Sequence, residues 1–144
     1  MAGLTDYMES TVLGLLFANT NIANLGDATG LRGSTAAGSL YVALFTATPT
    51  DVAATGTEAA YTGYARVADA RGTGTWTQSG TTQIANSTTI TFPACTAGSS
   101  TVVAFGLYDA PTGGNLLLYG PASLAISTGI TPAFAVGALV VTLD

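Results

Sequence analysis

Residues 4–18 are the stretch of the chain whose hydrophobic positions repeat at the helical period. The apolar positions near one face are Leu4, Met8, Val12, Leu15 and Leu16. Polar residues fall on the other face, and Asp6 and Glu9 have the spacing of a capping box. The pattern predicts an N-terminal helix that ends near Asn19. Its apolar stripe would pack within its own subunit or trimer, which we favour, or dock in an assembly.

Residues 19–38 are rich in Gly, Ala, Asn and Thr and show little periodicity. Loops of this length are uncommon in compact domains, and they are often functional or ordered by partners. We expect an extended arm, with Arg32 inside it. The sequence therefore predicts two parts, a helix and arm over residues 1–38 and a β domain over residues 39–144.

From Ser39 onward the pattern becomes that of β-strands. Residues 40–45 are continuously apolar, which predicts a strand buried on both faces. Further short strands are predicted at 64–68, 75–78, 83–85, 88–92, 101–108, 115–119, 122–127 and 139–143. Residues 52–63 are expected to form a surface loop, and residues 109–114 a hairpin connection. The sequence thus predicts a mainly β fold, an antiparallel β-sandwich or jelly-roll-like barrel of about eight short strands with one N-terminal α-helix.

The composition is unusually apolar for a chain of 144 residues. Hydrophobic residues make up 48% and charged residues only 8%, whereas a soluble domain is about 25% charged. The longest apolar runs fall well short of the roughly 20 residues that a membrane-spanning helix needs. We therefore expect no membrane association, and a surface largely covered by neighbours in an assembly.

The charges exclude further classes of partner. The net charge is −5, and the chain has neither lysine nor histidine. Nucleic-acid binding needs many cations to neutralise phosphates, and Arg32, Arg66 and Arg71 are too few. Because the chain has no lysine to pair with its acids, each arginine could form a bidentate salt bridge with a carboxylate. Arg66 and Arg71 flank Asp69, and the sequence leaves open whether they pair between subunits or only locally.

No arrangement of residues predicts catalysis. A hydroxyl or thiol nucleophile needs a base to activate it, and histidine and lysine are absent. Cys95 stands alone at the end of an apolar strand and is expected to be a small half-buried residue. Asp51 and Glu58 share one predicted loop, but solvated loop residues explain them better than a catalytic pair. We expect that the chain is not an enzyme.

Metal and cofactor binding are not predicted either. Asp109, Thr112 and Asn115 could offer oxygens around the hairpin, but calcium needs 6–8 oxygens and usually several carboxylates. Asp109 is more simply a turn residue whose side chain bonds the backbone. Gly113 and Gly114 precede a strand, so they do not form a phosphate-binding loop.

Two tyrosines are candidates for contact with a partner. Tyr61 and Tyr64 lie near the predicted surface loop and could meet a receptor or glycan, whereas core packing explains Trp76 at least as well. The candidate interface residues are Arg32, Arg66, Arg71, Tyr61 and Tyr64.

Several motifs resemble a known family. They are LYVALFT at 40–46 followed by Pro49 and GYARV at 63–67, ITFP at 90–93 followed by FGLYDA at 105–110 and GGNLL at 113–117, and FAVGALVVTLD at 134–144. Together they resemble small tailed-bacteriophage and prophage proteins that are usually labelled tail fibre proteins. The resemblance spans most of the chain, and it implies a structural protein of the virion.

The location within the virion is a separate question. The sequence has no collagen-like repeat, coiled-coil heptads or long β-helical repeat of the kind that fibres use. By analogy of architecture, a compact domain with an arm resembles a capsid decoration, or cement, protein. We therefore expect a homotrimer on the capsid surface that binds the major capsid protein or other virion proteins. The alternative is a tail or head fibre module that contacts the host.

Overall fold

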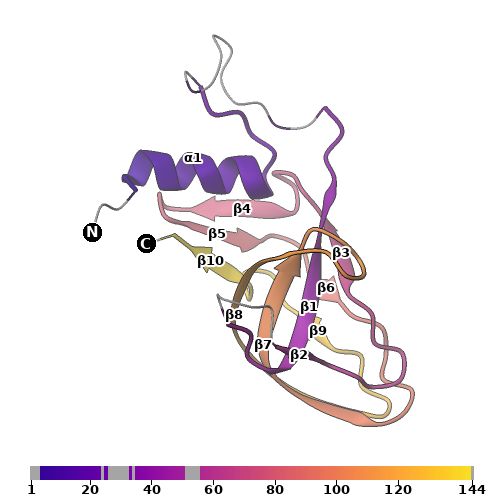
Figure 1. Cartoon of the computed structure of the whole chain (residues 1–144). Helices are drawn as coiled ribbons and strands as arrows, with labels where there is room; N and C mark the ends of the chain where they lie inside the picture. The colour runs from indigo at the N-terminus through magenta and orange to yellow at the C-terminus, as the bar shows by residue number, and fades with distance from the viewer. Residues whose placement is uncertain (1–3, 24, 26–32, 34, 51–55, 144) are drawn as a thin grey trace. The chain divides into compact units, whose positions relative to one another are not determined.

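The computed structural model describes residues 4–23, 25, 33, 35–50 and 56–143 (Figure 1). Helix α1 (Asp6–Phe17) precedes the strands. The strands are β1 (Ser39–Ala47), β2 (Thr57–Glu58), β3 (Val67–Ala70), β4 (Trp76–Ser79), β5 (Gln83–Asn86), β6 (Ile90–Thr91), β7 (Ser99–Tyr108), β8 (Leu116–Ser127), β9 (Ala133–Phe134) and β10 (Val140–Thr142). The predicted fold class, mainly β with antiparallel sheets and an N-terminal helix, is confirmed. Within the described residues, α1 is too short to cross a membrane.

The chain forms two compact units. Unit 1 comprises residues 1–39, 70–89 and 134–144, and unit 2 comprises residues 40–69 and 90–133. The predicted division into residues 1–38 and 39–144 as separate domains stays a prediction.

In unit 1, α1 packs beside the three-stranded sheet β10-β5-β4 (Figure 1). Thr5 caps the helix, because its hydroxyl accepts a hydrogen bond from the Met8 N–H at 3.4 Å. Phe17 meets Trp76 edge to face, with ring centroids 4.8 Å apart. At the other end of the helix, Arg71 donates to the carbonyls of Leu15 and Leu16, both at 2.6 Å. This cation at the carbonyl end stabilises the helix dipole.

The buried face of α1 differs from the predicted one. The helix does pack within its own subunit, as favoured, but through Leu13 and Phe17, with Glu9 and Gly14 also buried. Leu4 and Leu16, assigned to the core-facing stripe, are 52% and 49% exposed. The prediction of the face was wrong because α1 is apolar on both sides, and only the Leu13 side packs against the sheet.

Unit 2 is built on a five-stranded antiparallel sheet with the order β2-β1-β7-β8, in which β3 also pairs with β1. Val42, Ala43, Leu44 and Phe45 are each at most 1% exposed. This confirms the prediction of a strand buried on both faces. Gly106 faces Ala43 across the β1–β7 pair. It is a glycine because a side chain there would collide with the Phe45 ring and with Leu116.

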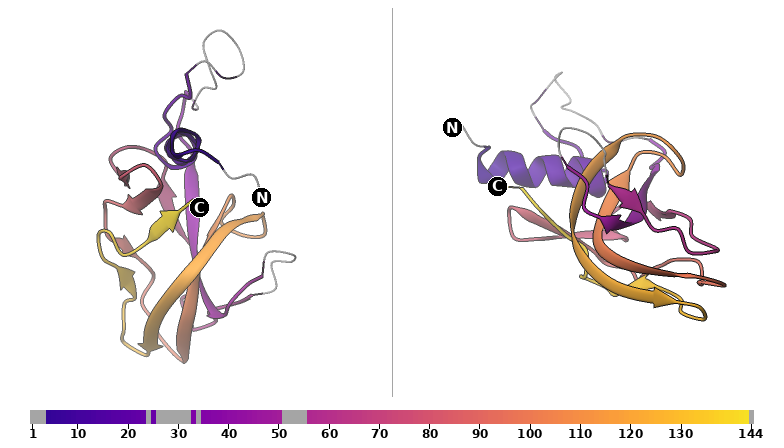
Figure 2. Two further views of the ribbon diagram at one scale, coloured as in Figure 1. Left: turned by 90° about the vertical axis from the view of Figure 1, so that its left-hand side faces the viewer. Right: turned by 60° about the horizontal axis from the view of Figure 1, so that its bottom comes forward.

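Three predicted boundaries were wrong. Residues 115–119 and 122–127 form one 12-residue strand, β8, which continues past Pro121 where the register to β7 shifts (Figure 2). The expected surface loop over 52–63 contains β2, and Ala59 is buried. The strand expected at 64–68 begins at Val67. In each case pairing with a neighbouring strand sets the boundary, and sequence pattern does not show such pairing.

Candidate functional site

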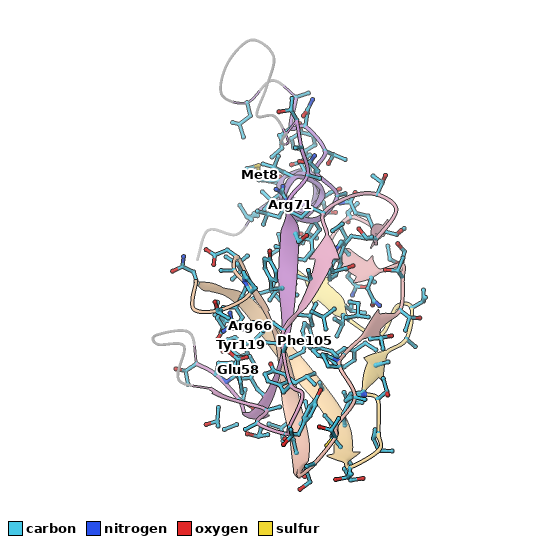
Figure 3. All side chains as sticks on the ribbon, turned by 90° about the vertical axis from the view of Figure 1, so that its right-hand side faces the viewer. Met8, Glu58, Arg66, Arg71, Phe105 and Tyr119 are labelled. Carbon is cyan, nitrogen blue, oxygen red and sulfur yellow. The ribbon has the colours of Figure 1, made fainter. Side chains whose placement is uncertain are left out.

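Arg66 is the centre of the densest polar cluster among the described residues, and it lies in unit 2 beside the β7–β8 hairpin (Figure 3). Its Nε lies 3.2 Å from each carboxylate oxygen of Glu58, and its Nη2 donates to Glu58 Oε1 at 2.5 Å. Its Nη1 donates to the carbonyls of Ala110 at 3.0 Å and Gly113 at 2.7 Å. The planar guanidinium thus joins β2 to the hairpin loop, which a lysine could not do.

The guanidinium is enclosed as well as bonded. Its Cζ lies 3.4 Å from the centroid of the Tyr108 ring, which gives a cation–π contact. The Arg66 side chain is only 9% exposed and the Glu58 side chain 27%. Burial alone would lower the pKa of Arg66, but the hydrogen bonds and the charge of Glu58 outweigh it and raise that pKa above its ordinary value.

Tyr64 completes the cluster. Its hydroxyl donates to Glu58 Oε2 at 2.8 Å and accepts from the Leu44 N–H of β1 at 3.1 Å. Burial raises the pKa of this phenol well above its ordinary value, and the neighbouring Glu58 carboxylate raises it further. Tyr64 and Arg66 therefore both stay protonated near neutral pH. The cluster is suited to holding a shape and a charge distribution.

The hairpin loop has the conformation that the sequence predicted. Asp109 accepts hydrogen bonds from the Asn115 backbone N–H at 2.7 Å and from its side-chain amide at 2.8 Å. These bonds hold the pKa of the Asp109 carboxyl below its ordinary value. Gly113 and Gly114 take positive φ angles of 60° and 71°, which glycine adopts without strain. Closure by Asp109 thus presents the loop carbonyls to Arg66.

An open pocket of about 360 Å³ lies over this cluster. It is lined by Glu58, Tyr64, Ala65, Arg66, Pro111, Thr112 and Gly113. Loop backbone, a proline, a threonine and one ion pair make a small, open recess with both polar and apolar lining. Chemically, such a recess can accept a polar group of a partner or ligand, and it shows no activated nucleophile.

The structure separates the five candidate interface residues. Arg66 and Tyr64 lie together in the cluster. Tyr61 is 3% exposed, and its hydroxyl donates to the Pro93 carbonyl at 2.9 Å. Arg71 caps α1 in unit 1, and Arg32 lies outside the described residues. Their assignment to an interface stays a prediction.

Neither described arginine pairs with Asp69, the carboxylate between them in sequence. Asp69 is 8% exposed, and its Oδ2 has no hydrogen-bond partner among the described residues. Burial raises the pKa of this carboxyl. Glu58 was missed as the partner of Arg66 because its segment was assigned to a solvated loop. The signal that could have found this ion pair is the lack of lysine, which leaves arginine to pair with the acids. Glu58 is the acid nearest in sequence to Arg66 apart from Asp69.

The described residues contain no group of three or more His, Cys, Asp or Glu side chains placed to hold a metal ion. Cys95 is 1% exposed, and its sulfur lies 3.4 Å from the carbonyl oxygens of Ala97 and Gly98. It is thus more deeply buried than the half-buried residue expected from sequence.

Comparison with known proteins gives one match at the level of families. The family described as podophage GP4 fiber I protein gp80 matches residues 3–142, which is nearly the whole chain. No curated protein matches the chain.

Proposed function

Because the chain belongs to the podophage GP4 fiber I protein gp80 family, and is thus a structural component of the bacteriophage virion, we propose that it decorates the head shell as a capsid cement protein. In this role copies of the chain associate as a homotrimer and bind the major capsid protein. The chain binds no cofactor and performs no catalysis.

The observation that carries the proposal is the amount of apolar side chain left uncovered on a chain with few charges. Nine large hydrophobic residues of the described part are at least 40% exposed, namely Leu4, Tyr7, Leu16, Leu25, Val103, Leu117, Ile130, Val136 and Val140. They come from both units. Scattered exposed apolar residues are normal, but here charged residues make up only 8% of the chain. A surface of this kind favours a subunit that is covered by several neighbours.

The outer edge of β8 supports the same proposal. β8 is the last strand in its sheet, and none of its 12 residues is charged. Proteins that are monomeric in solution usually protect such an edge with charged side chains, most often lysine. An edge protected only by Pro121 is tolerated where the assembly covers it.

A fibre module that contacts the host is the second candidate, because the matching family is described as a fiber protein. In that case the recess beside the hairpin, which Arg66 and Thr112 help to line, would be the place for a polar receptor group. A tail fibre differs from a cement protein in where the chain resides on the particle, and a head fibre differs from it in the number of copies.

Separated heads and tails test the proposal. Purified particles are dissociated, heads and tails are separated on a density gradient, and the chain is quantified in each fraction. The cement proposal predicts that the chain remains with the heads, and that stripping it lowers the temperature at which heads release DNA, since binding of many copies stabilises the shell. Recovery with tails alone would refute it and favour a tail fibre module.

A further inference from the structure

No further inference is drawn: the strongest candidate, the uncharged outer edge of β8 at the end of its sheet, is interrupted by Pro121 and by shifts in its register with β7, and nothing in the structure shows what covers it.

Discussion

Replacing Arg66 with methionine should destabilise unit 2 strongly while leaving a side chain of similar length. The change removes the bonds to Glu58, the bonds to the carbonyls of Ala110 and Gly113, and the contact with the Tyr108 ring. Glu58 then keeps the Tyr64 hydroxyl as its partner. Removing one partner of a buried ion pair costs about 3–5 kcal/mol. Since Glu58 is 27% exposed, we expect the lower end, about 3 kcal/mol.

Thermal unfolding followed by circular dichroism measures this loss at a fixed protein concentration. For a chain of 144 residues, a loss of about 3 kcal/mol should lower Tm by roughly 10 °C. Glu58→Gln tests the origin of the effect, because the double variant should be little worse than Arg66→Met alone, with a coupling of about 1–2 kcal/mol. A Tm drop of less than about 3 °C, or additive effects, would refute the view that the ion pair holds the hairpin.

Three further changes test the packing of the two units. Asp69→Asn should stabilise the protein by about 1 kcal/mol at pH 7, because burial raises the pKa of the Asp69 carboxyl and so disfavours its charged form. The wild type should become more stable as the pH falls through that raised pKa, so the advantage of the variant over the wild type should be smaller near pH 4 than at pH 7. Denaturant titrations that show the same advantage at both pH values would contradict the assignment. Asn86→Ala should cost about 3 kcal/mol in chemical denaturation, because it leaves two carbonyls without their donor and the Leu139 N–H without its acceptor, and a loss under about 1 kcal/mol would show that water replaces these bonds. Gly106→Ala should cost about 1–3 kcal/mol, since its Cβ would lie 2.6 Å from the Phe45 ring, whereas Gly74→Ala, with no atom within 4 Å, should be nearly neutral; equal Tm values for the two variants would refute the packing argument.

The sequence predicted those parts of the fold in which the local pattern and the tertiary packing agree. Residues 40–45 are apolar without interruption, and β1 is buried on both faces. The hairpin at 109–114 has its own turn chemistry, and Asp109 closes it as expected. Such features depend on neighbours in sequence, which a single chain displays directly.

The features that were missed depend on partners far away in sequence. α1 offers two apolar sides, and only packing against Trp76 of β4 selects the Leu13 side. Likewise Arg66 has a nearer acid in Asp69, but it pairs with Glu58 because β2 places that residue beside β1, opposite Phe45. The choice between two compatible partners is made by the sheet, and local spacing does not encode it.

The role of α1 in unit 1 also limits how the arm can be studied. Removing the first 38 residues would uncover Trp76, which is 1% exposed beside Phe17. Loss of head binding by such a truncation would therefore not separate docking from misfolding. Point changes of exposed residues avoid this ambiguity.

The number of copies of this chain per virion, relative to the major capsid protein, tests the central claim most directly. Quantitative mass spectrometry of purified particles gives this ratio. A protein that decorates the shell should be present in hundreds of copies per particle, in a simple ratio to the major capsid protein. A dozen or so copies would contradict the cement proposal and would assign the chain to the tail or to a fibre.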